Sequence, residues 1–431
     1  MGRSKRIAFT RLPLLVALAL IVVACSAPAS EQIGGTVSVV GSWEGAEEEA
    51  FLAVVRPFEE RTGIVVRYVG TRDLSGLIWQ GIARGQPPDV AGLPGPGPMA
   101  DFDEVGALVD LGQVIDIAQY KADTVPAFVD LGTINGKLVG VFIKATLKGL
   151  IWFNPKIYTL ETPHTWDEMM ASGQLAARDD AAPWCVALAS GATSGWPATD
   201  WIEDIILRQS GPDVYDDWAA GIQPWNSPEI RRAFETYGEV IGASFGGPAT
   251  VLATNFMDGG RPLFTDPPGC VFHHQGTFMT EFFRSRAGAR EGEYDFFPFP
   301  TIDENYANSV TGAGDLFGMF NDTPQARALI QYLVTPEAQQ IWVSRGGALS
   351  VNTQVTSYPD ELSSRAALVI RSAARVRFDA SDLMPEAMNT AFLQAVQEYT
   401  RSPDALDSIL LSLDEVRVGA YSGEIMTGPR Q

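Results

Sequence analysis

Residues 35–93 read GTVSVVGSWEGAEEEAFLAVVRPFEERTGIVVRYVGTRDLSGLIWQGIARGQPPDVAGL. Three short segments rich in β-branched residues alternate here with two segments whose apolar residues recur at helical spacing. This pattern predicts strand, helix, strand, helix and strand in turn. In chain order these elements span 35–41, 47–61, 64–69, 74–84 and 89–93. Strands joined by helices form a parallel sheet with right-handed crossovers, so we predict the α/β fold class.

The last of these strands leads directly into a proline-stiffened loop, Leu93-Pro94-Gly95-Pro96-Gly97-Pro98. Ligands of open α/β sheets bind beyond the carboxyl ends of the strands. We therefore expect the backbone of this loop, Leu93 and Pro94 included, to contact a ligand.

Capping patterns indicate several helices later in the chain. Thr165-Trp166-Asp167-Glu168 fits a capping box. Thr323, Thr335 and Ser402 each precede a proline, which predicts an N-cap residue followed by proline at the first helical position. From Thr323 onward the chain is predicted to be mostly helical.

The composition is that of an ordinary globular protein, with 431 residues, 46% of them hydrophobic and 19% charged. This length predicts two or three domain-sized units. The formal net charge of −21 disfavours binding to nucleic acid, because like charges repel. Three His and three Cys leave little for a zinc or iron–sulfur site, so we expect no metal and no cofactor.

The N-terminus reads as an export signal. A basic segment precedes an apolar run, Leu12–Ala24, that is short for a membrane span and has the length of a signal peptide's apolar region. The sequence VVAC at its end resembles the bacterial lipobox. We predict a signal peptide at 1–24, a lipid anchor on Cys25 and a tether over 25–32. The alternative is a plain secretory signal with a chance cysteine.

Export places the two remaining cysteines in an oxidising compartment. A disulfide between Cys185 and Cys270 is therefore expected, the alternative being two buried free thiols. His273 and His274 are neighbours on an expected strand and so face opposite ways, which argues against a metal pair.

Several further segments, taken together, resemble the extracellular solute-binding proteins of ABC sugar importers, the maltose-binding-like family, and among them the α-glucoside type. Their order and spacing over 33–425 carry the resemblance. They are FEERTGI (58–64), PDV (88–90), IWFNPK (151–156), TWDEM (165–169), GWP (195–197), DWIED (200–204), TGAGDLF (311–317), SRGGALS (344–350) and 379–384.

This resemblance implies the two-lobe periplasmic-binding-protein fold of type II, with the ligand in the interlobe cleft. The N-terminal lobe would be 33–145 plus 301–334, and the C-terminal lobe 146–300 plus 335–431. The resemblance implies an extracytoplasmic protein that performs no chemistry, and with the lipobox we expect a lipid-anchored monomer. It captures a carbohydrate, here an α-glucoside or other oligosaccharide, and delivers it to the permease subunits in the membrane.

Two other functions stay open from the sequence. One is an exported glycan-degrading enzyme, because a glycosidase needs only a pair of carboxylates and the chain is rich in acids. The other is a receptor of the same fold for a non-sugar solute such as a polyamine, which would suit the acidic charge.

A sugar site needs aromatic platforms and convergent hydrogen-bonding side chains. The resemblance points Glu44 at sugar hydroxyls, the alternative being an acidic helix start. Trp43 is either a wall of the cleft or a packing residue. Trp196, in a Gly-rich loop, is the expected stacking platform. Asp200 and Trp201 are expected in the same pocket, although Asp200 fits a helix N-cap as well.

The remaining candidates come from three later or neighbouring segments. Gly314 and Asp315 lie in a Gly-rich segment that we predict to be a turn, and Lys148 lies near the first crossing between lobes. The strand-then-turn segment around Gly276 contributes His274, Gln275 and Phe278. One departure concerns Leu393, which stands where related proteins carry a Trp, and which puts the identity and length of the sugar in question.

Overall fold

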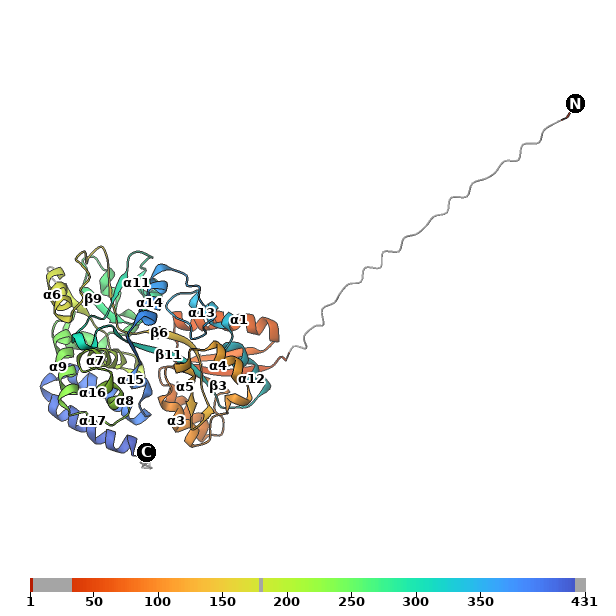
Figure 1. The fold of residues 1–431 in the computed structure, drawn as a ribbon, viewed down its shortest axis with the longest axis horizontal. Coiled ribbons are helices and arrows are strands. Elements are labelled where there is room, and N and C mark those ends of the chain that lie inside the picture. Colours follow the sequence, from red (N-terminus) through yellow and green to blue (C-terminus); the bar gives the residue numbers. More distant parts are fainter. Residues whose placement is uncertain (3–32, 178–180, 423–431) are drawn as a thin grey trace. The chain divides into compact units, whose positions relative to one another are not determined.

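A computed structural model describes residues 1–2, 33–177 and 181–422. From Ile33 onward the described chain forms a single packed unit that contains two main β-sheets (Figure 1). The predicted signal peptide, the anchor at Cys25 and the tether lie outside the described residues. No helix of the described part is both long and apolar enough to cross a membrane.

The first main sheet has six strands, in the order β12-β11-β3-β1-β2, with β6 also paired to β11. We call the body built around it the first lobe. The sheet is formed by β1 (Thr36–Gly41), β2 (Val65–Gly70), β3 (Val90–Leu93), β6 (Val141–Leu147), β11 (Ser309–Met319) and β12 (Arg375–Phe378).

The opening stretch folds as predicted. Strand β1 pairs in parallel with both β2 and β3, and α1 (Ala46–Thr62) and α2 (Leu74–Ala83) form the two crossovers. On α1, Phe51 and Phe58 are almost fully buried. Burial of a large apolar side chain stabilises the fold by roughly 1.5–3 kcal/mol, so this helix is held mainly by its apolar face.

The Gly-rich segment around Gly314 was predicted to be a turn, and this prediction is wrong. It lies in the middle of β11, which pairs in antiparallel fashion with β6 and shifts register between Asp315 and Leu316. The small residue is needed for close packing, because a Cβ on Gly314 would lie 2.8 Å from the Phe128 ring and 2.9 Å from the carbonyl oxygen of Lys144.

The second main sheet has four strands in the order β10-β7-β9-β8 and forms the centre of the second lobe. Its strands are β7 (Leu150–Phe153), β8 (Ala182–Cys185), β9 (Cys270–Gln275) and β10 (Asp295–Pro298). Cys185 and Cys270, on the neighbouring strands β8 and β9, form the expected disulfide with a Cα–Cα distance of 5.6 Å.

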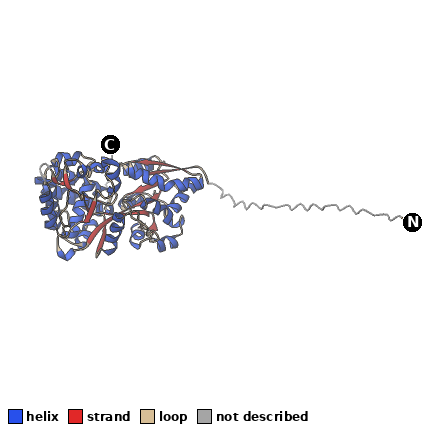
Figure 2. Ribbon diagram, turned by 90° about the horizontal axis from the view of Figure 1, so that it is seen from above, coloured by secondary structure: helices blue, strands red, loops and turns tan. Residues whose placement is uncertain are grey.

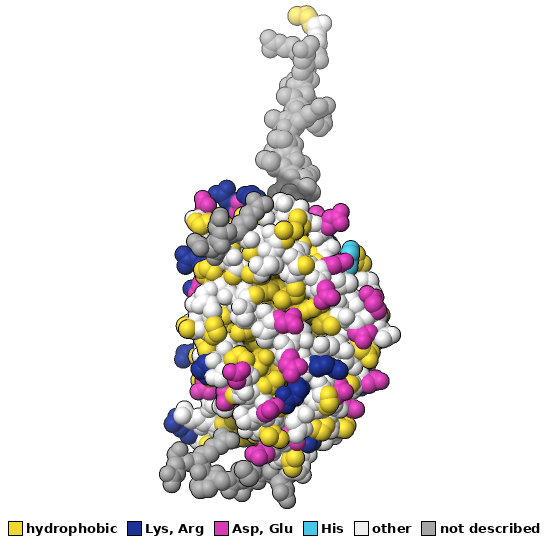
Figure 3. All heavy atoms as spheres, turned by 90° about the vertical axis from the view of Figure 1, so that its left-hand side faces the viewer, with side chains coloured by type: hydrophobic (Ala, Val, Ile, Leu, Met, Phe, Trp, Pro, Cys, Tyr) yellow, Lys and Arg dark blue, Asp and Glu magenta, His cyan; other side chains and the backbone are white. Residues whose placement is uncertain are grey.

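Acidic side chains are scattered over one face of the molecule in Figure 3.

Helices cover both sheets (Figure 2). Besides α1 and α2 they are α3 (Gly97–Glu104), α4 (Ile117–Asp123), α5 (Pro126–Leu131), α6 (Trp166–Ala176), α7 (Trp196–Gln209), α8 (Pro212–Ala219), α9 (Pro228–Gly242), α10 (Gly247–Ala253), α11 (Met279–Ala287), α12 (Pro324–Leu333), α13 (Pro336–Val343), α14 (Glu361–Ser372), α15 (Ala380–Leu383), α16 (Glu386–Arg401) and α17 (Leu406–Tyr421). A small hairpin, β4 (Thr133–Ile134) and β5 (Lys137–Leu138), completes the strands of the described residues.

Three of the four predicted caps are confirmed. Thr165 and Glu168 form the capping box of α6, and the hydroxyls of Thr323 and Thr335 cap α12 and α13. The cap at Ser402 is wrong, because its side chain makes no capping bond and the next segment is a short 3-10 turn.

The chain passes between the lobes from β6 to β7 and again from β10 to β11. Two elements beyond residue 334 lie with the first lobe. Helix α13 packs on α1, and strand β12 pairs with β11. The last helices, α16 and α17, pack together, and α16 also packs on α7 of the second lobe.

Candidate functional site

A cavity of about 340 Å³ lies between the lobes, and residues of both lobes line it. We call this cavity the cleft. Its volume falls within the range of ligand pockets, ~300–1,000 Å³. Trp43, Leu93 and Pro94 border it from the first lobe, and Trp196 and Phe278 border it from the second. The predicted ligand-contacting loop therefore does reach the cleft.

Strand β6 and its continuation form one wall of the cleft. Because side chains alternate along a strand, Lys144, Thr146 and Lys148 lie on the same side and all border the cavity. The ammonium group of Lys144 lies 3.2 Å from a carboxylate oxygen of Glu47 and 3.1 Å from one of Asp315. These ion pairs fix the charged groups on the first-lobe side.

Lys148 makes the matching arrangement on the second-lobe side. Its ammonium group lies 2.9 Å from carboxylate oxygens of both Asp200 and Asp379. All three side chains are nearly fully buried. Burial alone would lower the pKa of Lys148, but the two carboxylates outweigh it and raise this pKa well above its ordinary value. Lys148 is therefore protonated and positively charged at neutral pH.

The acids around Lys148 differ from one another. Burial raises the pKa of Asp200 to about 8, with Lys148 opposing the shift and Asp379 adding to it. For Asp379, burial also acts to raise the pKa, but its bonds to Lys148 bring the value below the ordinary one. Burial and the charge of Asp379 raise the pKa of Asp382 well above its ordinary value. The cleft thus holds both ionised and protonated carboxyl groups near neutral pH.

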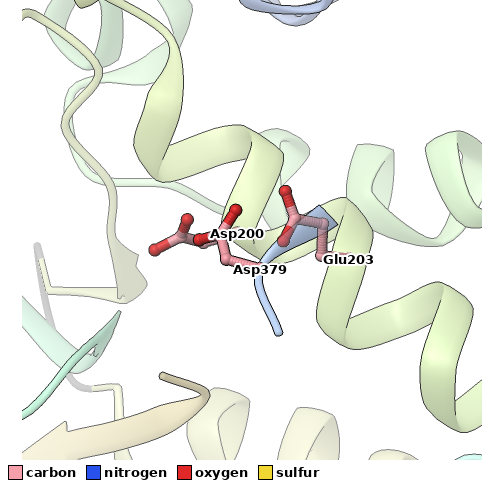
Figure 4. A group of neighbouring side chains, drawn as sticks. All are labelled: Asp200, Glu203 and Asp379. Carbon is pink, nitrogen blue, oxygen red and sulfur yellow. The ribbon is translucent and has the colours of Figure 1, made fainter. Parts of the chain in front are cut away.

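Figure 4 shows Asp200, Glu203 and Asp379, whose carboxylate oxygens lie within 4.8 Å of one another, a spacing that a metal ion could bridge. These oxygens are already engaged. Lys148 binds both aspartates, and Glu203 accepts backbone N–H bonds of 2.9 Å from Ala380 and 3.1 Å from Ser381. The group therefore joins α7 to the start of α15.

An aromatic patch faces the cleft from the second lobe. Trp196, at the first position of α7, packs on Phe256 and Phe278 with ring centroids 5.0 and 5.9 Å apart. The Lys148 ammonium lies 5.1 Å from the centroid of the Trp196 ring. The indole nitrogen is buried and has no hydrogen-bond partner among the described residues. A ligand oxygen in the cleft could accept this bond.

Arg72 lies opposite this patch and was missed by the sequence analysis. Its guanidinium stacks 4.6 Å from the ring centroid of Phe256, so it reaches from the first lobe to the second. Its Nε lies 3.7 Å from Glu44 and its Nη2 lies 3.9 Å from Glu47, and neither nitrogen has a hydrogen-bond partner within the described chain. Arg72 follows β2, so the rule for ligands at strand ends would have found it.

The walls of the cleft touch each other beyond the cavity. Trp79 of α2 donates a 2.8 Å hydrogen bond to Glu386 of α16. Asp382 packs directly against Gly95, where a side chain would collide with it. Together with the Arg72–Phe256 contact, these interactions show that the two lobes are closed on each other.

The structure brings most of the predicted site residues together and leaves the others elsewhere. Those that line the cleft are Trp43, Leu93, Pro94, Lys148, Trp196, Asp200, Phe278 and Asp315. Those outside its lining are Glu44, Trp201, His274, Gln275 and Gly314. Leu393, the departure from the related proteins, also borders the cleft.

The outlying residues have clear structural positions. Trp201 packs in the core between Trp184 and His274. His274 forms a 2.7 Å hydrogen bond with Asp204, and the side chain of Gln275 accepts a bond from the amide of Gly276. Glu44 is half-buried beside Arg72, and its neighbour Glu47 is the acid that borders the cleft.

Two alternatives left open by the sequence are resolved. Asp200 is not the helix N-cap, because α7 begins at Trp196 and Gly195 precedes it. Trp43 is both a packing residue and part of the wall. It is 1% exposed, packs against Phe51, and donates from its indole nitrogen to Asp315 over 3.2 Å.

The sequence profile of bacterial extracellular solute-binding proteins matches residues 42–340. The chain belongs to this family. It is 35% identical over 407 residues to the osmoprotective compounds-binding protein GgtB of Synechocystis sp., a match that covers 92% of this chain and 96% of that protein. It is 36% identical over 395 residues to the alpha-glucosides-binding periplasmic protein AglE of Rhizobium meliloti, covering 87% and 85% of the two chains.

Solved structures agree on the fold. The bacterial solute receptor AcbH, which has a substrate preference for β-D-galactopyranose, matches with a TM-score of 0.79 at 17% identity, over 90% of this chain and 100% of that chain. A chitin oligosaccharide binding protein matches equally well, at 18% identity over the same shares. These matches confirm the predicted two-lobe α/β fold. The chain is an extracytoplasmic solute-binding component of an ABC importer and not an enzyme.

Proposed function

We propose that this solute-binding protein captures a carbohydrate, an α-glucoside or another small oligosaccharide, in the cleft and delivers it to the permease subunits of its importer. The observation that carries the proposal is Trp196, whose ring borders the cleft and whose indole nitrogen has no partner in the described structure. A sugar offers a weakly apolar face to such a ring and hydroxyl oxygens to such a donor.

The polar groups of the cleft suit hydroxyl groups. A hydroxyl both donates and accepts, so it can take a bond from Arg72 while giving one to a carboxylate. Two nitrogens of Arg72 lie at ion-pair distance from Glu44 and Glu47 and have no hydrogen-bond partner in the part of the chain that the structure describes. This pattern supports a ligand that carries neighbouring hydroxyls, as every sugar does.

The relatives support the same ligand class. AglE binds alpha-glucosides and GgtB binds osmoprotective compounds, according to their names. The volume of about 340 Å³ lies near the lower end of the range for ligand pockets, which favours a short glycoside over a long oligosaccharide.

The proposal is tested by calorimetry with glucose, maltose, trehalose, sucrose and maltotriose. Spermidine serves as the non-sugar comparison, since it represents the polyamine alternative. We expect saturable binding of at least one glucoside and none of spermidine. Binding of spermidine alone would refute the assignment to carbohydrates.

We also propose that Cys25 carries a lipid anchor, that 1–24 is removed as its signal peptide, and that the protein acts as a monomer. The sequence VVAC at 22–25 supports the anchor. A Cys25→Ala variant expressed in a bacterial host should leave the membrane fraction, while the parent protein stays with it.

Light scattering on the purified protein measures its molar mass and so tests whether it is a monomer. We also propose the lobe boundaries. The first lobe comprises 33–145 and 301–334 together with α13 and β12, and the second lobe comprises 146–300 and the rest of 335–431.

A further inference from the structure

A second cavity of about 170 Å³ lies beside the segment that returns from β10 to β11. We call it the rear cavity. Strand β11 borders both cavities, because Ser309 and Val310 line the rear cavity while Ala313 and Asp315 line the cleft. The rear cavity is far larger than the ~15 Å³ that one water requires, so it has room for a small molecule.

The charge of the rear cavity contrasts with that of the whole chain. Arg208 is the charged residue of its lining, and no Asp or Glu is among the described residues that line it. The chain as a whole carries a formal net charge of −21. The carboxylate that pairs with Arg208, that of Asp204, lies outside this lining, so among the described residues the cavity wall itself presents a guanidinium and no acid, which suits a negatively charged occupant.

Arg208 is built into this position from several sides. Its side chain is 3% exposed and stacks 4.8 Å from the ring centroid of Phe299. Its Nη1 lies 2.5 Å from Asp204, which also bonds His274 and Thr311. Its Nε and Nη2 carry no hydrogen bond to any described residue. These two nitrogens form the edge with which arginine binds a carboxylate or phosphate in a bidentate manner.

Neutral donors complete the site. Tyr306 and Thr301 line the rear cavity, and neither hydroxyl has a hydrogen-bond partner within the described chain. Hydroxyl groups donate readily to the remaining oxygens of an anion. The apolar residues of the lining are Pro298, Phe299, Val310 and Val369.

We propose that the rear cavity binds a small anion, an oxyanion or a short carboxylate, on the free edge of Arg208. Helix α7 runs from the cleft to this site. Asp200 lines the cleft and Arg208 lines the rear cavity, and with Asp204 between them they recur at intervals of four residues and so share one helix face. The anion occupies a place separate from the sugar. The inference therefore stands or falls independently of the proposed function.

The test measures binding of inorganic phosphate and of acetate by calorimetry and by thermal shift, with the ionic strength held constant by sodium chloride in every titration. We expect saturable binding of at least one of the two probes, and which one binds distinguishes oxyanion from carboxylate. Absence of saturable binding of both probes would overturn the proposal.

Three variants locate the binding. Val369→Phe fills the rear cavity and leaves Arg208 intact, so it should reduce anion affinity at least tenfold while sugar binding stays within twofold. Leu368→Phe, at the exposed neighbouring position, is the matched control and should change neither. Tyr306→Phe should weaken anion binding several-fold. Anion binding that survives Val369→Phe unchanged places the anion elsewhere and refutes the site.

Discussion

The indole nitrogen of Trp79 donates a 2.8 Å hydrogen bond to Oε2 of Glu386 across the cleft. Trp79 lies on α2 of the first lobe, and Glu386 begins α16 on the second. Separation of the lobes would break this bond. It therefore belongs to the closed form alone, and it contributes to the difference in free energy between the open and closed forms. A ligand shifts that equilibrium only by the difference in its affinity for the two forms.

Trp79→Phe should weaken sugar binding without unfolding the protein. Phe keeps an aromatic ring at the position that packs 4.9 Å from Phe102, whereas the indole donor and the second ring of the indole are lost. A hydrogen bond to a charged group contributes about 1.5–3 kcal/mol, so affinity should fall by roughly 10-fold or more. The matched control is Glu398→Gln, an exposed acid on the same helix, which should leave affinity unchanged. Equal affinity of Trp79→Phe and parent would show that the bond does not stabilise closure.

Lys148→Met should strongly destabilise the fold, because it leaves Asp200 and Asp379 buried without their cation. Breaking a buried ion pair from one side costs about 3–5 kcal/mol. Lys156→Met is the control, since Lys156 pairs with Glu293 at the surface with 67% of its side chain exposed. That change should cost less than about 1 kcal/mol. Urea unfolding of the two variants gives both values, and similar losses would contradict the prediction.

The sequence predicted local structure well where short-range rules decide it. Alternation, helical spacing and capping residues located β1, α1, β2, α2 and β3 within a few residues of their observed bounds. The rules failed at Gly314, because glycine there serves close packing across β11 and β6, and a one-dimensional pattern does not distinguish that need from a turn.

The cleft was predictable only in part. Trp196 and Lys148 were found because loops and crossings carry ligand residues, whereas Trp201 and His274 were placed in the site although both are core residues. Trp196 and Trp201 stand five residues apart on α7, about 140° round the helix, and so face different ways. Which of these two side chains faces the cleft depends on how α7 packs on β9. Local sequence patterns do not predict that packing.

Trp196→Ala and Trp196→Phe should separate the two roles of this side chain. Phe keeps an aromatic face and loses the indole donor, so affinity for the sugar should fall roughly 5-fold, as expected for ~1 kcal/mol. Ala removes the ring as well and should lose at least tenfold more. Trp225→Phe, deep in the second lobe's core, is a control for general loss of stability. Calorimetry with the sugar identified in the screen measures all three, and identical affinities for Ala and Phe would exclude stacking.

Reduction of the Cys185–Cys270 disulfide should lower stability and leave sugar binding intact. The bond closes a loop with a sequence separation of 85 and joins two neighbouring strands that do not border the cleft. Loss of a native disulfide costs about 2–5 kcal/mol. The Cys185→Ala, Cys270→Ala double variant should show this loss in urea unfolding at unchanged affinity. A large fall in affinity in the folded variant would show that the disulfide positions the site.

The fold should lose stability between about pH 5 and pH 8 in part through Glu281. This residue of α11 is 6% exposed, and burial followed by repulsion from Glu47 raises its pKa to about 8, against the attraction of Lys144. Between its unfolded pKa of about 4.3 and this value, the folded chain holds a proton that the unfolded chain releases. The stabilisation is therefore complete below pH ~4 and is lost as the pH rises through 8, with a slope of at most ~1.4 kcal/mol per pH unit.

Glu281→Gln isolates this contribution, because glutamine keeps the shape of the protonated acid and does not titrate. Near pH 4 its free energy of unfolding should be close to that of the parent. From pH 5 to pH 8 it should exceed that of the parent by an amount that grows with pH, because only the parent loses this contribution, while other buried acids contribute equally to both chains. Glu49→Gln, an exposed change on α1, should follow the parent at every pH. Urea unfolding at four pH values measures the difference. A Glu281→Gln curve parallel to the parent from pH 5 to pH 8 would show that Glu281 is already ionised throughout this range.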